Sequence, residues 1–215
     1  MLAHPAIQLL VNDLAAIRGT RVIFRGLGLE ASGGDAVTLV GPNGAGKTTF
    51  LRCLSGLLRP FHGTITIKGC DDEQSVGEQC HYIGHLNGIK PAFTVSDNLV
   101  FFADFLGGSR EDVAQAAERL ALAELEDIPA AYLSAGQKRR LGLARLHCAR
   151  RPLWLLDEPA VSLDQASQHI LAGMVAEHLA SGGIVIAATH TPLGWSDAKT
   201  IDFAQIARQS VADAL

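Results

Sequence analysis

The segment GPNGAGKTT, residues 41–49, has the residue types and spacing with the clearest chemical meaning. Its glycines let the backbone curl so that several N–H groups point at one phosphate. Lys47 can neutralise phosphate oxygens, and the Thr48 hydroxyl can bind Mg²⁺. The spacing G-x-x-x-x-G-K-[ST], between an apolar run and a helical pattern, therefore predicts a nucleoside triphosphate site. The residues expected to contact the nucleotide here are Gly41, Pro42, Asn43, Gly44, Ala45, Gly46, Lys47, Thr48 and Thr49.

A second group of reactive side chains follows the apolar run LWLL at residues 153–156, which ends in Asp157 and Glu158. An acidic pair after a strand is often only a helix cap or a solvated turn. The phosphate loop upstream favours a chemical role instead. We expect Asp157 to hold Mg²⁺ through water, and Glu158 to be the general base that accepts a proton from an attacking water.

His190 ends the apolar run IVIAATH, and a histidine at the end of a strand is most often structural. Here, however, the runs at 36–40, 152–159 and 184–190 are expected to be strands of one sheet that point the same way. Their carboxyl ends then meet in the crevice where such sheets bind ligands. We therefore expect His190 to contact the γ-phosphate. The residues predicted to take part in catalysis are Lys47, Glu158 and His190.

The order of the predicted elements indicates an α/β fold. Strands and helices alternate along most of the chain, which predicts a mainly parallel sheet. The helical patterns that break this alternation are at 94–108, 109–125 and 134–151. We interpret about 86–150 as an inserted helical subdomain within a single domain that spans 1–215. The core of that domain would take about 1–85 and 151–205.

Composition narrows the class of protein. With 215 residues and 48% hydrophobic residues the chain can bury a sizeable core, and a net charge of -4 argues against a dedicated nucleic-acid binder. No segment resembles a signal peptide or a membrane span, so a membrane role would need spans from another chain. The cysteines predicted to be reduced, small buried residues are Cys53, Cys70, Cys80 and Cys148.

The motif LSAGQ, residues 133–137, adds a second anion-binding helix start, made of Ser134 and the free N–H groups of Ala135 and Gly136. Together with the phosphate loop, LLDEP, SLD at 162–164 and His190, in this order, it makes the chain resemble the ATP-binding-cassette (ABC) ATPases. The resemblance covers about residues 7–195. It implies a P-loop NTPase core with a small N-terminal antiparallel β region and an inserted helical subdomain.

The resemblance also implies a partner for the second helix start. In the family, two copies of the chain pair head to tail. The LSAGQ segment, called the signature motif, of one copy then covers the ATP and Mg²⁺ of the other. Asp164 would then lie at the dimer interface. The residues expected to act on the nucleotide of the second copy are Ser134, Gly136 and Gln137.

Two positions depart from the family pattern. Arg18 stands near the place of a tyrosine that stacks on adenine, and its guanidinium plane can stack on a base or can simply be exposed in a turn. His85 stands where the family has a glutamine that contacts Mg²⁺, and we expect a role for it near the site. The residues predicted to serve the metal are Thr48, Asp157 and His85.

Longer stretches narrow the resemblance to the ATP-binding subunits of cytochrome c maturation, the haem exporter group. These stretches are at 81–99, 132–146 and 151–164. The resemblance implies an ATPase at the cytoplasmic face of the bacterial inner membrane, peripheral, with a CcmB-like integral membrane subunit and a CcmC-like haem-handling protein. Whether the ATPase exports haem or releases a haem-loaded chaperone stays open. The same ATPase serving another transporter is the alternative.

Other classes fit less well. A cassette ATPase of DNA repair needs long coiled-coil insertions, one of translation carries two cassettes, and a non-catalytic module would have lost a residue such as Lys47 or Glu158. The basic residues after the signature are predicted to form a solvated or subunit-facing helix side, with no nucleic-acid or lipid role. They are Lys138, Arg139, Arg140 and Arg145.

Overall fold

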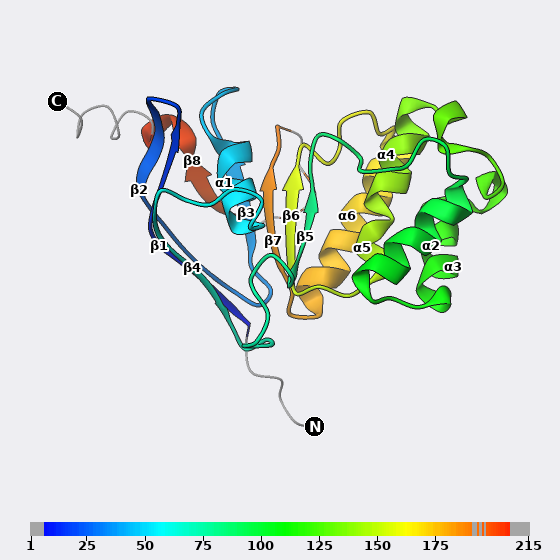
Figure 1. Cartoon of the computed structure of the whole chain (residues 1–215), viewed down its shortest axis with the longest axis horizontal. Coiled ribbons are helices and arrows are strands. Elements are labelled where there is room, and N and C mark those ends of the chain that lie inside the picture. The colour runs from blue at the N-terminus through cyan, green and yellow to red at the C-terminus, as the bar shows by residue number, and fades with distance from the viewer. Residues whose placement is uncertain (1–6, 191–192, 194, 196, 207–215) are drawn as a thin grey trace.

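A five-stranded parallel sheet lies at the centre of the chain, with the order β5-β6-β7-β3-β8 (Figure 1). The structure is a computed structural model that describes residues 7–190, 193, 195 and 197–206. The strands of the sheet are β3 (Ala36–Val40), β5 (Cys80–Ile83), β6 (Leu153–Asp157), β7 (Ile184–Ala188) and β8 (Lys199–Asp202). Every residue of β6 and β7 is buried, as expected for parallel strands covered on both faces.

A three-stranded antiparallel sheet covers one side, with the order β2-β1-β4. Its strands are β1 (Gln8–Arg18), β2 (Arg21–Ser32) and β4 (His62–Lys68). Helix α1 (Lys47–Leu54) lies between the two sheets (Figure 1). Phe24 of β2, Phe50 of α1 and Phe203 meet in one aromatic cluster, with ring centroids 6.1, 6.1 and 5.8 Å apart. This cluster fixes the antiparallel sheet against the phosphate loop and its helix.

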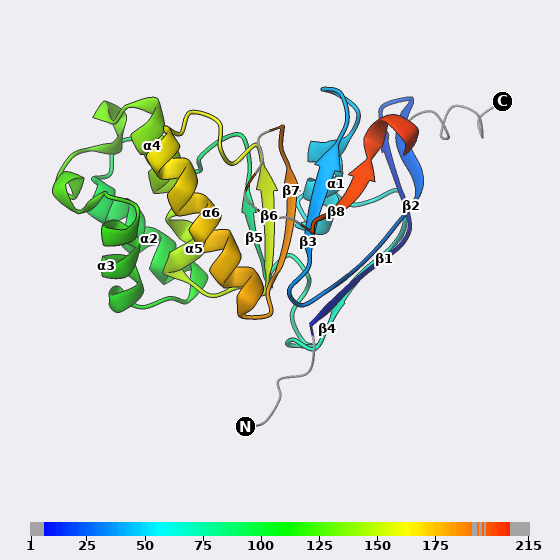
Figure 2. The same ribbon diagram turned by 180° about the vertical axis from the view of Figure 1, so that it is seen from behind.

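The other side of the parallel sheet is covered by helices (Figure 2). They are α2 (Val95–Leu106), α3 (Arg110–Arg119), α4 (Ala135–Leu143), α5 (Arg145–Cys148) and α6 (Gln165–Ala180), with the 3₁₀ turns η1 (Ala123–Leu125) and η2 (Ala130–Tyr132). Three of the helices, α2, α3 and α4, begin with a capping box in which a hydroxyl and a side chain three residues later satisfy the first N–H groups. Local sequence thus defines where these helices start.

The α/β class and the antiparallel N-terminal sheet were predicted correctly, and the helices α2 to α5 do lie between β5 and β6. Some details were wrong. The pattern at 134–151 is two helices separated at Ala144, and the pattern at 109–125 ends as a helix at Arg119. Strand β8 was not predicted. The boundaries of core and subdomain stay predictions.

All four cysteines are free thiols, as expected. Cys53, Cys80 and Cys148 are buried, whereas Cys70 is only half-buried, so the predicted burial is wrong for Cys70. Burial raises the pKa of the Cys80 thiol to about 12, so it packs as a small apolar group. Among the residues that the structure describes, no helix has both the length and the apolar character needed to cross a membrane.

Candidate nucleotide-binding site

The shape of the phosphate loop depends on glycine. Gly46 has φ 112°, and a Cβ atom there would lie 2.7 Å from Cγ2 of Ile23 in β2. Gly41 has φ 130°, and a Cβ atom there would lie 3.2 Å from the backbone nitrogen of Ala204. A larger residue would therefore clash at Gly46 and be crowded at Gly41, and it would strain the backbone at both places. The loop connects the end of β3 to the start of α1, where the helix dipole favours an anion.

Lys47 is the first residue of α1, and its side chain folds along the loop. Its ammonium donates hydrogen bonds to the carbonyl oxygens of Gly41 at 2.6 Å and Pro42 at 3.2 Å. Only 8% of the residue is exposed. The positive charge is thus held beside the loop's N–H groups, where phosphate oxygens would lie.

Thr48 and Asp157 come together although they belong to different elements. The Thr48 hydroxyl donates a 2.8 Å hydrogen bond to Oδ2 of Asp157. Asp157 is the last residue of β6 and is only 5% exposed. A hydroxyl oxygen and a carboxylate oxygen at this distance are ligands suited to Mg²⁺, which accepts one or two protein oxygens beside substrate phosphates. The residues present therefore fit the metal that the sequence predicts.

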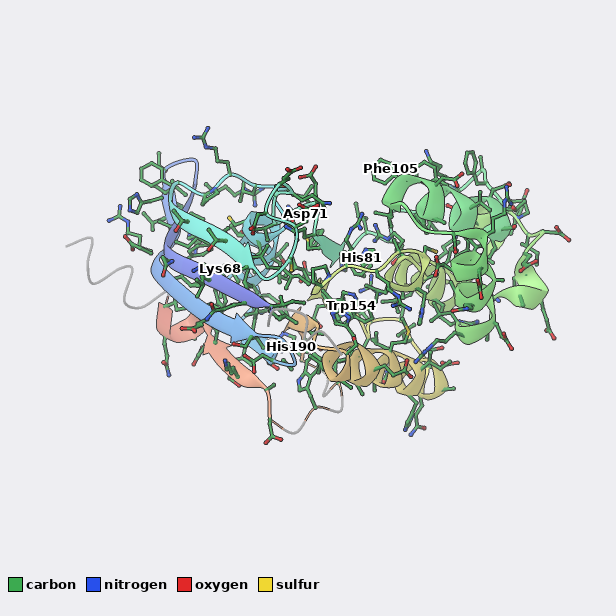
Figure 3. All side chains as sticks on the ribbon, turned by 90° about the horizontal axis from the view of Figure 1, so that it is seen from below. Lys68, Asp71, His81, Phe105, Trp154 and His190 are labelled. Carbon is green, nitrogen blue, oxygen red and sulfur yellow. The ribbon has the colours of Figure 1, made fainter. Side chains whose placement is uncertain are left out.

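Glu158 and His190 face each other at the carboxyl ends of β6 and β7. Oε1 of Glu158 lies 3.6 Å from Nε2 of His190, with side-chain exposures of 24% and 60%. The backbone of Glu158 is left-handed, with φ 47°, and its N–H donates to the carbonyl of Ala188 at 2.7 Å. Water can thus reach a carboxylate whose backbone is fixed to the neighbouring strand. Figure 3 shows where His190 lies among the side chains.

Two residues of this region were not predicted to lie in it. Tyr82 of β5 interacts through its hydroxyl with Arg52 and Asp157; burial raises the pKa of that hydroxyl, Arg52 lowers it and Asp157 raises it. Tyr82 could have been predicted to lie near the site, because it stands close to the end of a predicted parallel strand. Arg139 of α4 donates to the carbonyl oxygens of Asp157 and Glu158, at 3.2 and 2.7 Å.

The prediction of a solvated or subunit-facing helix side is therefore wrong for Arg139 of α4 and for Arg145, the first residue of α5. Arg139 is buried, and Arg145 packs over the ring of Phe102, 5.4 Å from its centroid, where burial lowers the pKa of Arg145 to about 10. Arg140 donates to the carbonyl of Leu120 at 2.8 Å, and Lys138 to that of Ala131 at 2.9 Å. The side chains of Lys138, Arg139 and Arg140 thus donate hydrogen bonds to backbone carbonyl oxygens of the same chain.

The second helix start is built as the sequence suggested. The Ser134 hydroxyl accepts from the N–H of Gln137 at 3.2 Å, and the Gln137 side chain accepts from the N–H of Ser134 at 2.8 Å. A Cβ atom on Gly136 would lie 3.0 Å from the carbonyl oxygen of Ser162, so α4 begins close against the SLD segment. Asp164 caps α6 by accepting from the N–H of Ser167 at 2.8 Å. Ser134 and Asp164 are both exposed.

The structure brings some of the predicted residues together and leaves others apart. Lys47, Thr48 and Asp157 form one site, with Glu158 and His190 beside it. Helix α4 lies on the other side of strands β5, β6 and β7 from α1 (Figures 1 and 2). Arg18, at the end of β1, and His85, after β5, are exposed, and their roles stay predictions.

Comparison with known proteins agrees with this geometry. Residues 24–161 match the family model for ABC transporters. The chain is 52% identical, over 183 residues, to the "Cytochrome c biogenesis ATP-binding export protein CcmA" of Rhodopseudomonas palustris strain BisB5, covering 85% of this chain and 92% of that protein. It is 51% identical, over 187 residues, to the protein of the same name from Bradyrhizobium diazoefficiens, covering 87% and 94%.

Solved structures give the same result. The ATP-binding subunit of an ABC transporter superposes with a TM-score of 0.76 at 26% identity, covering 85% of this chain and 79% of that one. A bacterial Atm1-family ABC exporter with ATP bound superposes with a TM-score of 0.74 at 26% identity, covering 88% of this chain and 35% of that one. The chain therefore belongs to the ABC transporter family of ATP-binding proteins and, within it, to the CcmA group.

Proposed function

We propose that this chain is the ATP-hydrolysing subunit of an inner-membrane ABC complex that serves cytochrome c maturation. The observation that carries the proposal is the meeting of the phosphate loop with Asp157, Glu158 and His190 at the carboxyl edge of one parallel sheet. The names of the relatives support the pathway, because proteins about half identical over most of their length are cytochrome c biogenesis ATP-binding export proteins.

The site residues divide the chemistry between them. The loop N–H groups and Lys47 bind and orient the triphosphate. Thr48 and Asp157 would hold Mg²⁺, which when bound draws charge from the β- and γ-phosphate oxygens. Glu158 accepts the proton of the attacking water at a carboxylate oxygen. His190 binds the γ-phosphate and, from 3.6 Å, orients the Glu158 carboxylate.

The signature helix points to a homodimer. Ser134, Gly136 and Gln137 start a helix that lies across the sheet from the phosphate loop of the same chain (Figure 2). A second copy, paired head to tail, would place its own Ser134 over the ATP. Closure of the two copies on ATP and their opening after hydrolysis would drive the membrane partner.

Exposed apolar side chains of the helical region support a membrane partner. The exposed fractions are 84% for Leu86, 40% for Phe93, 77% for Phe105 and 82% for Tyr132, all in or beside the helical region. Phe105 projects from α2 (Figure 3). Exposed apolar side chains mark an interaction site where they gather into one contiguous patch. A CcmB-like integral subunit, assembled with a CcmC-like haem-handling protein, would hold this chain at the cytoplasmic face of the inner membrane.

The proposal is tested by deleting the gene and staining membranes for covalently bound haem. We expect mature c-type cytochromes to disappear while the membrane subunits still assemble. Complementation with the wild-type gene should restore them, and complementation with the Glu158→Gln variant should not. Normal cytochrome levels after deletion would refute the pathway, and restoration by the variant would refute the need for ATP hydrolysis.

A further inference from the structure

Arg139 reaches from α4 to the carboxyl edge of the parallel sheet, and only 4% of it is exposed. A guanidinium group has five N–H groups, and here there are acceptors for all of them. The acceptors are the carbonyl oxygens of Pro159 at 3.0 Å, Gly84 at 2.9 Å, Asp157 at 3.2 Å and Glu158 at 2.7 Å, and Oδ1 of Asn87 at 3.1 Å. One side chain thus connects α4, the loop after β5 and the turn after β6.

These acceptors are all uncharged oxygens. Burial lowers the pKa of Arg139, while the carboxylates of Asp157 and Glu158 oppose that shift. An arginine stays charged at physiological pH. Arg139 therefore places a permanent positive charge behind the two acidic residues without occupying a carboxylate oxygen. Those oxygens stay available for the metal and for water.

The backbone of Glu158 needs such support. Its φ of 47° is in the left-handed region, which residues other than glycine adopt at a cost and keep only where neighbours fix it. The N–H of Glu158 donates to Ala188, and its carbonyl accepts from Nη2 of Arg139, both at 2.7 Å. Both peptide groups of this residue are therefore held from outside the turn.

We infer that Arg139 is a positioning residue for ATP hydrolysis: it fixes the left-handed turn that aims the Glu158 carboxylate, and it links that turn to the signature helix and to the loop at Gly84–Asn87. The inference rests on the proposed ATPase function. Through the Arg139 side chain, a movement of α4 would be transmitted directly to Glu158, the proposed general base. Arg139 itself need not touch the nucleotide.

The test compares Arg139→Lys with Arg140→Lys in the full-length chain, assembled with its membrane partners. Arg140 is a matched control because it is the next residue of α4 and also donates to backbone carbonyls, those of Leu120 and Ala121, away from the site. Both substitutions keep the positive charge and remove the planar guanidinium group with its five N–H donors. We expect Arg139→Lys to lower kcat about tenfold or more with KM for ATP within about threefold, because a misplaced catalytic group loses rate rather than binding. Arg140→Lys should keep kcat within about twofold.

Hydrogen exchange of the nucleotide-free chain gives a second measurement that needs no activity. The peptide that carries the Glu158 amide should exchange faster in Arg139→Lys than in the wild type. In Arg140→Lys its exchange rate should equal that of the wild type. Equal kcat in the two variants, or equal exchange at this peptide, would overturn the inference. A parallel fall in kcat and in ATP affinity would also overturn it, since that pattern belongs to a general structural role.

A milder variant covers the case in which Arg139→Lys does not fold. Asn87→Ala removes one acceptor of Nη1 from a half-exposed position. It should lower kcat several-fold, speed exchange at the Glu158 peptide and leave KM unchanged; wild-type values for both kcat and exchange would count against the inference. If the wild type itself did not hydrolyse ATP, the proposed function would fail, and the exchange result would still report whether Arg139 holds the turn.

Discussion

The Thr48 hydroxyl donates a 2.8 Å hydrogen bond to the Asp157 carboxylate, and this contact joins the first turn of α1 to the last residue of β6. Two residues 109 positions apart in the sequence thus present oxygen atoms at one point. The buried β6 strand fixes Asp157, and the glycine loop fixes Thr48. Two of the three side chains predicted to serve the metal, Thr48 and Asp157, therefore lie in contact, whereas the role of His85 stays a prediction.

Replacing Thr48 should separate metal-dependent activity from folding. Thr48→Val keeps the side-chain shape but removes the hydroxyl that donates to Asp157 and serves Mg²⁺. We expect Mg²⁺-dependent ATP hydrolysis to fall by about 100-fold or more, because a charge-stabilising contact is lost, and the free energy of unfolding to fall by about 1 kcal/mol. A Mg²⁺ titration of the ATPase rate measures the first effect. Thr48→Ser keeps the hydroxyl and should retain most activity; an inactive serine variant would count against metal binding here.

Replacing Glu158 should stop turnover without preventing ATP binding. Glu158→Gln keeps the size of the side chain but cannot accept the proton of water, so multiple-turnover hydrolysis should fall by about 100- to 10,000-fold. ATP should then accumulate bound to a closed dimer, seen as an earlier peak in size-exclusion chromatography. Glu124→Gln, at an exposed position of η1, is the control. Normal turnover by Glu158→Gln would rule out this carboxylate as the base.

Mixing two inactive chains should restore activity if the signature acts on the other copy. We expect Lys47→Ala and Ser134→Arg each to be inactive as homodimers. In the mixed dimer one site carries both defects, whereas the other combines an intact phosphate loop with an intact signature. The ATPase rate of the mixture should therefore exceed that of either variant alone. If mixing gave no gain while mixed dimers were present, Ser134 would not act in trans.

Stability should depend on pH through the buried His81. Nε2 of His81 lies 2.7 Å from the carbonyl oxygen of Ala149, and burial lowers the pKa of His81 from 6.5 to about 4 (Figure 3). The unfolded chain then binds a proton that the folded chain rejects, so stability is present above about pH 6.5 and is lost as the pH falls toward 4. Between pH 7 and pH 5 the contribution of His81 should fall by about 2 kcal/mol, at about 1.4 kcal/mol per pKa unit.

Urea unfolding at pH 7 and pH 5 measures this change. His81→Gln should lose stability overall but show a smaller difference between the two pH values. The exposed His85 provides the control, since His85→Gln should keep the wild-type difference. His178, whose pKa is also lowered to about 4 by burial, accounts for part of the remaining dependence. An unchanged difference in His81→Gln would contradict the assignment.

Sequence was sufficient where the chemistry is local. The phosphate loop follows the strand β3 and leads into α1, so motif and context together predicted the position of Lys47 and Thr48 in the first turn of this helix, while their roles stay predictions. Asp157 and Glu158 could be placed because an apolar run leads directly to them. The parallel direction of the strands then brought His190 to the same edge, as predicted.

The sequence was insufficient where the position of a residue depends on backbone groups far away along the chain. Arg139 stands between two other basic residues, which is typical of a solvated helix face, yet carbonyl oxygens from segments 18 to 55 residues away bury it. Strand β8, with the sequence KTID, is short and partly polar and is stabilised by pairing with β3. The separation of α4 from α5 at Ala144 has no proline and no capping residue to signal it.

The capping box at the start of α4 would make closure of the proposed dimer an exchange of hydrogen bonds. The N–H groups of Ser134 and Gln137 already have partners within their own chain. An incoming γ-phosphate that takes either of them must displace an existing bond, so each exchanged bond adds only a net difference of about 1 kcal/mol or less. A contact stabilised by such small net differences would break readily once the γ-phosphate has left. The two copies could then separate after each round of ATP hydrolysis.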